Sequence, residues 1–151
     1  MRQQHLQDDK LTQELNNTSV FNKTMKTNLT NKLNELKIEG ESIEVGAGYS
    51  LQRLALETSN LGLEGLEFAT GIPGSVGGSV YMNAGAYNNS MSNVIKKVTV
   101  LTPELEVKDL YNNELDFSYR DSFIKKNPGY IVLSVTLELK KGNIEEMKKD
   151  I

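Results

Sequence analysis

Four stretches of the chain carry the apolar patterns of β-strands. Residues 43–45 alternate apolar and charged side chains and run into a glycine turn. Residues 94–101 are β-branched and apolar, and a proline turn separates them from 105–110. Residues 130–139 form the strongest of the four, with Val132, Ser134, Thr136 and Glu138 alternating against apolar neighbours. Period-two alternation is typical of half-buried strands, so we expect a sheet in which 94–101 and 105–110 form a hairpin.

One helix is predicted from spacing and from its cap. Ser50 is a good N-cap residue. After it, side chains that can be buried recur at i, i+3, i+4 and i+7, at Leu51, Leu54, Ala55 and Thr58. This spacing predicts a helix over 51–59 with one buried face. Asn143 followed by Glu146 resembles a capping box and predicts a second, charged helix at the end of the chain.

These elements indicate the α+β class, with a mixed sheet and one or two helices on a face. The chain has 151 residues, which is enough for one domain with a sizeable core. Residues 1–28 are polar and lack both glycine and proline. They are compatible with a weak helix or with a disordered tail, and both alternatives stay open.

Composition excludes several classes of function. The net charge is −3, without the basic stripe of a nucleic-acid-binding protein. There is no cysteine, and His5 is the single histidine, so we expect no metal site. No apolar run approaches the roughly 20 residues of a membrane span, and the N-terminus lacks a signal-peptide pattern. We therefore expect a cytoplasmic protein that binds neither membrane nor nucleic acid.

Glycine is concentrated between residues 63 and 90, and we expect neither an ordinary strand nor a helix there. Glycines let backbone N–H groups face a ligand directly, as in phosphate and flavin sites. The spacing fits neither the Rossmann fingerprint nor the P-loop. The alternative is a tight structural turn. The candidate ligand-binding residues are Gly71, Ile72, Pro73, Gly74, Ser75, Val76, Gly77 and Gly78.

Two further segments carry candidate chemistry. Asn83 offers a donor and an acceptor, and the small residues Gly85 and Ala86 would let a flat ring lie against the backbone; the alternative is that Asn83 caps a helix end. Arg120 beside Tyr119 could bind a carboxylate or phosphate bidentately. Its alternative is a surface ion pair with the neighbouring aspartate, worth little. The lysine pair at 125–126 is expected to face solvent.

Together these segments resemble a known family. "GLEGLEFATGIPGSVGGSVYMNAGAY" at 62–87 and "DFSYRDSF" at 116–123 are similar to UDP-N-acetylenolpyruvoylglucosamine reductases. "IEVGAGYSLQRLALETSNLGLEGLEF" at 43–68 and "IVLSVTLEL" at 131–139 extend the likeness in both directions. The resemblance covers about residues 29–139, and the combined motif is far more specific than any of its pieces.

The resemblance implies the second subdomain of an FAD-binding domain of the vanillyl-alcohol-oxidase (PCMH) type. It implies FAD as cofactor, NADPH as reductant and a UDP-sugar enolpyruvate as substrate, in peptidoglycan precursor synthesis. Residues 71–78 would line the flavin, with the Asn83–Ala86 segment close by. Arg120 would engage the substrate carboxylate and act in catalysis, and Tyr119 would lie in the same site.

The departures from the family pattern matter as well. Family members are longer, and they carry a glycine-asparagine turn for the FAD diphosphate that 1–28 lack; their proton-donating serine and catalytic glutamate belong to a C-terminal domain. We therefore divide the chain into an unassigned segment (1–28), an FAD-binding subdomain (29–140) and the start of a linker (141–151), with an exposed surface prone to self-association. The alternative function is a non-catalytic flavin- or nucleotide-binding module that needs a partner chain. A flavin oxidase is disfavoured, because no histidine or cysteine for covalent attachment lies near the glycine segment.

Overall fold

The computed structural model of the protein describes residues 33–142. A five-stranded sheet has the order β1-β2-β8-β6-β7. Its strands are β1 (Leu36–Glu39), β2 (Ser42–Gly46), β6 (Ile95–Leu101), β7 (Val107–Tyr111) and β8 (Ile131–Glu138). The helices are α3 (Leu51–Asn60), α4 (Val76–Met82) and α5 (Phe123–Lys126), and the 3-10 turns are η1 (Glu67–Gly71), η2 (Met91–Asn93) and η3 (Asn112–Glu114). Two small ribbons pair β3 (Leu63–Glu64) with β9 (Lys140–Lys141), and β4 (Gly85–Ala86) with β5 (Asn89–Ser90).

The α+β class is confirmed, and so is the hairpin of β6 and β7. The sheet was expected to mix parallel and antiparallel strands, but all four pairings in the large sheet are antiparallel. The strands β2 and β6 run in the same direction, but β8 lies between them. Strand β8, the last of the five in the sequence, thus lies between two strands that would be parallel if they were neighbours.

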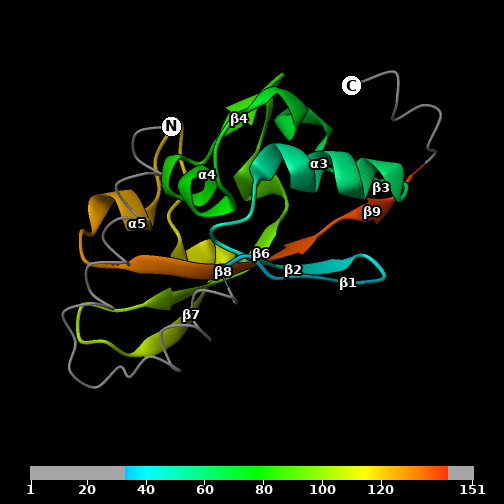
Figure 1. Cartoon of the computed structure of the whole chain (residues 1–151). Coiled ribbons are helices and arrows are strands. Elements are labelled where there is room, and N and C mark those ends of the chain that lie inside the picture. The colour runs from blue at the N-terminus through cyan, green and yellow to red at the C-terminus, as the bar shows by residue number, and fades with distance from the viewer. Residues whose placement is uncertain (1–32, 143–151) are drawn as a thin grey trace.

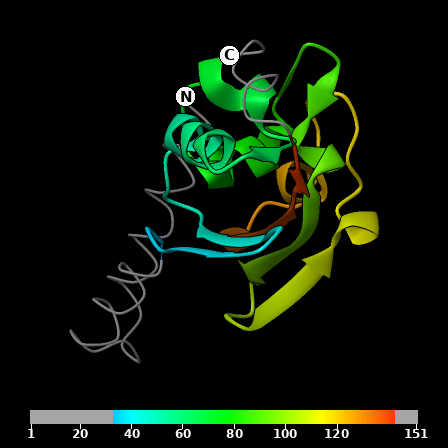
Figure 2. The same ribbon diagram turned by 90° about the vertical axis from the view of Figure 1, so that its right-hand side faces the viewer.

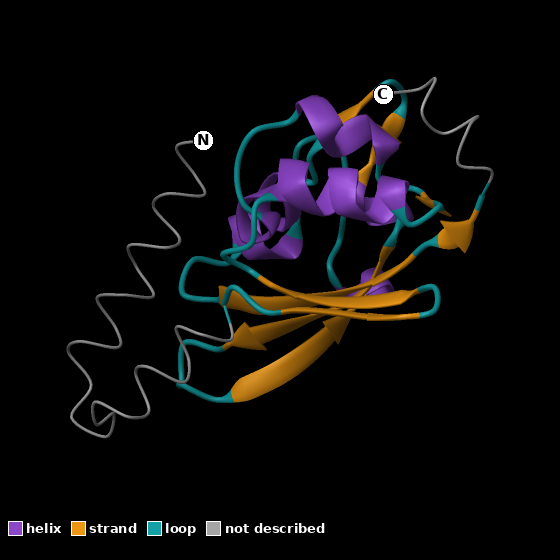
Figure 3. Cartoon of the chain, turned by 45° about the vertical axis from the view of Figure 1, so that its right-hand side comes forward, coloured by secondary structure: helices purple, strands orange, loops and turns teal. Residues whose placement is uncertain are grey.

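The helices cover a single face of the sheet (Figures 2 and 3). The side chains that point from the sheet into this layer are fully buried, among them Ile43, Val98 and Val135. Their strand neighbours on the opposite face are polar or charged and include Glu44, Lys97 and Thr136. The sheet therefore packs one face on the core and leaves the other polar, as antiparallel sheets commonly do.

The predicted helix at 51–59 is confirmed as α3, which begins and ends within one residue of the expected bounds. The Ser50 side chain accepts a hydrogen bond from the Arg53 N–H, as expected of an N-cap. The four positions expected to face the core, Leu51, Leu54, Ala55 and Thr58, are all buried. Local sequence signals were sufficient here because cap and stripe lie within ten residues of one another.

The expectation that the glycine-rich stretch contains no helix is wrong, because α4 includes Gly77 and Gly78. Both glycines are buried where α4 contacts β2 and β8. The Gly77 N–H donates to the Ala47 carbonyl at 2.8 Å, and the Ser75 side chain caps the helix through the Gly78 N–H. Tertiary hydrogen bonds and close packing against the sheet thus outweigh the low helix propensity of glycine.

Two expectations lie outside the described residues, namely the character of 1–28 and the helix beginning near Asn143. Within residues 33–142, no helix is long and apolar enough to cross a membrane.

Candidate functional site

The glycine segment leads into the N-terminal end of α4 and forms backbone hydrogen bonds with residues at the start of α3. The Leu51 N–H donates to the Gly74 carbonyl, and the Val76 N–H donates to the Tyr49 carbonyl, both at 2.9 Å. Gly74 has φ +124°, a conformation that favours glycine. The proposed structural turn is therefore present, and it fixes the path of the backbone at 74–77.

Gly71 has no such structural reason to be glycine. It is exposed, its φ is not positive, and a Cβ built on it would meet no atom within 4 Å. Beyond Pro73, the N–H groups of Gly74 and Ser75 have no acceptor within the described part of the chain. A smooth backbone with open space at Gly71 and unused donors beside it fits a ligand that lies against the main chain, such as a flavin nucleotide.

Asn83 ends α4 in the left-handed conformation, with φ 45° and 8 % exposure. Its amide donates to the Ser118 carbonyl at 2.9 Å and accepts from the Ser92 N–H at 3.0 Å. The helix-end alternative is thus what the structure contains, and the side chain ties α4 to two loops. A contact between Asn83 and a ligand stays a prediction, as it does for the following segment.

Asn83→Ala is expected to lower the free energy of unfolding by about 2–4 kcal/mol, because two buried hydrogen bonds are lost and alanine is strained in the left-handed region. Urea denaturation measures this loss. Asn83→Gly, which tolerates positive φ, should recover the part due to strain. Equal losses for the two variants would contradict the assignment of strain to this position.

Gly85 and Ala86 form β4, one strand of a short ribbon beside Asn83. A Cβ at Gly85 would lie 2.6 Å from the Asn89 carbonyl oxygen, so this glycine is required by the ribbon itself. At the tip of the ribbon, Tyr87 is 88 % exposed with φ 53°. An exposed aromatic residue in the left-handed region is a candidate ligand contact. Tyr87 is not among the site residues predicted from the sequence.

Tyr119 and Arg120 lie together on an exposed loop between η3 and α5. Tyr119 is 85 % exposed, and the Arg120 guanidinium lies 5.3 Å from the centre of its ring. The expected alternative, a pair between Arg120 and Asp121, is not formed. The Asp121 carboxylate instead accepts from the Ser122 N–H and lies 3.7 Å from the Lys126 ammonium.

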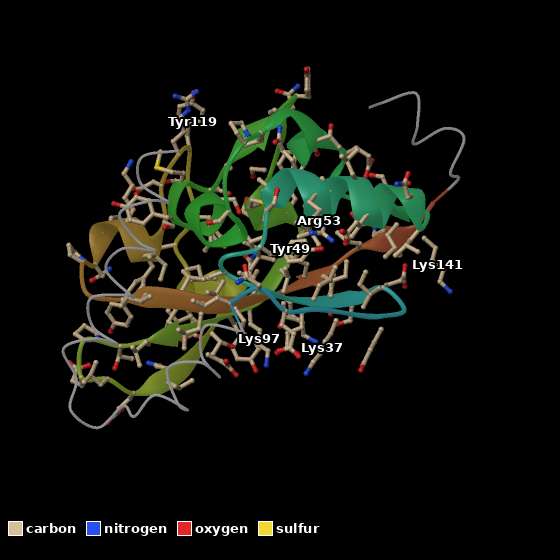
Figure 4. The ribbon with its side chains drawn as sticks, in the orientation of Figure 1. Lys37, Tyr49, Arg53, Lys97, Tyr119 and Lys141 are labelled. Atoms are coloured by element: carbon tan, nitrogen blue, oxygen red, sulfur yellow. The ribbon has the colours of Figure 1, made fainter. Side chains whose placement is uncertain are left out.

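The two candidate parts of the site are held at opposite ends of α4 (Figure 1). Ser75 caps the N-terminal end, next to the glycine segment. At the other end, the Tyr81 carbonyl accepts from the Ser122 hydroxyl, and Asn83 holds the Ser118 carbonyl. Seven residues of helix span about 10 Å. Figure 4 places Tyr119 on the helical side of the molecule, away from Lys37 and Lys97.

A separate side-chain cluster supports the backbone that holds the glycine segment. The Tyr49 hydroxyl donates to the Glu57 carboxylate, and the Arg53 Nε donates to the same carboxylate at 2.6 Å. Burial, followed by the hydrogen bond with Glu57, raises the pKa of Tyr49, so it stays protonated at neutral pH. Residues 33–142 contain no group of three or more histidine, cysteine or acidic side chains arranged to hold a metal ion.

The sequence profile of the FAD binding domain matches residues 15–111, more than half of the chain. The chain belongs to the FAD binding domain family. The α+β fold of the FAD-binding domain, inferred from the sequence, is thereby confirmed.

Named relatives agree with this assignment. UDP-N-acetylenolpyruvoylglucosamine reductase of Anoxybacillus flavithermus is 49 % identical over 115 residues, which are 76 % of this chain and 38 % of that protein. The reductase of Bacillus subtilis is 48 % identical over 116 residues, 76 % of this chain and 38 % of its own. The crystal structure of the Thermus caldophilus enzyme superposes with a TM-score of 0.71 at 36 % identity, covering 79 % of this chain and 42 % of that one.

The resemblance to UDP-N-acetylenolpyruvoylglucosamine reductases, predicted from the sequence motifs, is therefore confirmed over the matched residues. The chain spans about two fifths of the length of the relatives it matches.

Proposed function

We propose that the chain is the FAD-binding part of a reductase that converts UDP-N-acetylglucosamine enolpyruvate to UDP-N-acetylmuramate with NADPH. The observation that carries the proposal is the pairing of an open glycine segment with an exposed Tyr119–Arg120 loop, at the two ends of α4. The proposed ligands would contact the two ends of this helix, whose residues 76–80 are themselves buried. The reaction belongs to cytoplasmic peptidoglycan precursor synthesis, and so to cell wall biogenesis, cell shape and cell division.

The flavin side of the proposed site is residues 71–78 with Asn83, Gly85 and Ala86. Bound FAD would supply hydride transfer, chemistry that no side chain provides. The open position at Gly71 lets a flat ring approach the backbone, and the Gly74 N–H, which has no acceptor among residues 33–142, can donate to it. The bonds from Leu51 and Val76 hold this backbone before a ligand arrives.

The substrate side is the Tyr119–Arg120 pair. Hydride addition to the enolpyruvyl double bond builds negative charge toward the carboxylate, and a guanidinium there stabilises it. The planar guanidinium matches a carboxylate in a bidentate geometry that lysine does not reproduce. Arg120 is thus the proposed catalytic residue, and Tyr119 supports it from beneath the guanidinium.

A titration of the purified chain with FAD, followed by flavin fluorescence, is the first test of this function. Saturable binding at micromolar FAD is expected, and absence of binding would overturn the assignment for this chain. NADPH oxidation dependent on the enolpyruvyl sugar nucleotide then separates the reductase from the alternative, a binding module without turnover. Self-association through an exposed surface stays a prediction, and size-exclusion chromatography during the titration reports it.

Gly71→Ala is expected to separate folding from cofactor binding. No described atom opposes the new methyl group, and loss of glycine restricts the unfolded chain, so stability should be unchanged or higher by about 0.5 kcal/mol. The same methyl group would occupy the space proposed for the ligand, and FAD affinity should fall about tenfold, equivalent to about 1.4 kcal/mol. Urea denaturation and the fluorescence titration measure the two effects; unchanged FAD affinity would remove Gly71 from the site.

A further inference from the structure

The loop that carries Tyr119 and Arg120 is held in an unusual backbone conformation. Two of its non-glycine residues have left-handed φ values, Asp116 at 47° and Arg120 at 50°. Such residues persist only where surrounding contacts determine the conformation, and they concentrate at functional sites. The contacts that hold this loop therefore bear on how Arg120 is presented.

Main-chain and hydroxyl contacts fix the middle and the end of the loop. Ser118 and Asp121 exchange two backbone hydrogen bonds, at 3.2 and 3.1 Å. Asn83 holds the Ser118 carbonyl, and the buried Ser122 donates to the Tyr81 carbonyl at 2.8 Å. The Phe123 N–H donates to the Leu115 carbonyl at 2.6 Å and closes the base of the loop, but none of these contacts involves Asp116 itself.

Lys126, the last residue of α5, contacts Asp116. Its ammonium group donates to the Asp116 carboxylate and lies 3.4 Å from the Asp116 carbonyl oxygen. It also lies 3.7 Å from the Asp121 carboxylate. The hydrogen bond with Asp116 raises the pKa of Lys126, which keeps its charge at neutral pH. One cation thus joins the two carboxylates that bracket the Tyr119–Arg120 turn. The prediction that this lysine faces solvent is confirmed, because Lys126 is exposed, and the sequence did not indicate its two partners.

The neighbouring Lys125 makes a different contact. Its ammonium group donates to the Arg120 carbonyl at 3.1 Å and forms no ion pair with Asp116 or Asp121. Both lysines lie on the same helix and carry the same charge. Comparing Lys125 with Lys126 therefore separates the ion pairs with Asp116 and Asp121 from the effect of a positive charge next to the loop.

We propose that Lys126 is a positioning residue. It forms ion pairs with Asp116 and Asp121, so that Arg120 stays available to a carboxylate-bearing sugar nucleotide. The inference rests on the proposed function for the identity of the ligand. Asp121 follows Arg120 directly in the chain, so we expect its carboxylate to pair with the guanidinium when Lys126 is removed. An Arg120–Asp121 pair would compete with the substrate carboxylate. Lys126 prevents that competition and touches no reacting atom itself.

The test compares Lys126→Met, Lys126→Arg, Lys125→Met and the double variant Lys126→Met/Asp121→Asn. Each is titrated calorimetrically with UDP-N-acetylglucosamine enolpyruvate and with UDP-N-acetylglucosamine, which lacks the carboxylate. Lys126→Met should bind the first ligand three- to tenfold more weakly, with affinity for the second, FAD affinity and the urea midpoint unchanged. Lys126→Arg and the double variant should restore binding, and Lys125→Met, which removes a hydrogen bond to the Arg120 carbonyl but no ion pair with Asp116 or Asp121, should lose less affinity than Lys126→Met. Failure of Asp121→Asn to restore binding, or an equal loss in Lys125→Met, overturns the inference.

A ligand-free readout keeps this result distinct from failure of the proposed function. If the wild-type chain binds neither sugar nucleotide, the function fails, while the competition is still measured by the NMR signal of the Arg120 Nε–Hε group. That signal should move on Lys126→Met as the Asp121 pair forms, and return in the double variant. An unmoved signal overturns the role of Lys126 whatever the ligand. Raised salt should weaken the new pair, because exposed charges are screened.

Discussion

Arg120→Ala is expected to abolish the chain's preference for a UDP-sugar that carries the enolpyruvyl carboxylate. Hydrogen bonds to charged groups contribute about 1.5–3 kcal/mol, and each 1.4 kcal/mol is tenfold in affinity. The enolpyruvyl ligand should therefore bind the variant about 10- to 100-fold more weakly, while UDP-N-acetylglucosamine binds as before. Arg120→Lys should recover only part of the loss, because an ammonium group cannot form the bidentate contact.

Isothermal titration of both ligands against the wild type and the variants measures this difference. Arg53→Ala is the matched control, since Arg53 also stacks on a tyrosine, at 5.5 Å from the Tyr49 ring, but it belongs to α3 and not to the loop. An enolpyruvyl ligand that keeps its advantage in Arg120→Ala would assign the carboxylate to another group.

Leu54→Ala is expected to lower the free energy of unfolding by about 2–5 kcal/mol, the range for a leucine removed from a packed core. Leu54 is fully buried on the face of α3 that packs against the core. Single domains are stable by only about 5–15 kcal/mol, so this loss is a large part of the total. Chemical denaturation of the chain, at a concentration where it is monomeric, gives the value.

Leu56 provides the matched control for this prediction. It lies on the same helix, two residues further on, and is 44 % exposed. Leu56→Ala should change stability by less than about 1 kcal/mol, because little apolar area returns to water and alanine is the better helix former. Similar losses at the two positions would contradict the buried face of α3.

Elements whose signals are local were predicted correctly. The cap at Ser50 and the spacing of the buried positions in α3 are a few residues apart, so they act before the rest of the chain is placed. The strands β6 and β8 lie within the predicted ranges 94–101 and 130–139, the first indicated by β-branched apolar residues and the second by alternation. The motifs formed by the glycine segment and the Tyr119–Arg120 pair also indicated the family, while the chemistry of these residues stays a prediction.

The tertiary structure decided what depends on residues far apart in the chain. The antiparallel order of the sheet depends on β8 entering between β2 and β6, which no local pattern encodes. Glycine disfavours a helix by about 1 kcal/mol per residue. The bond from Gly77 to Ala47, the Ser75 cap on Gly78 and packing on the sheet offset this cost in α4.

The same distinction applies to the candidate site. Residue types in the sequence predicted a flavin-binding glycine segment and an arginine that binds a carboxylate, and both roles stay predictions. Only the fold decided that the Asn83 amide forms hydrogen bonds with the Ser118 carbonyl and the Ser92 N–H, and that Lys126 forms ion pairs with Asp116 and Asp121. The physical reason is that hydrogen bonds and ion pairs depend on distances of a few ångströms, which the chain sets only when α4, α5 and the connecting loops are packed together.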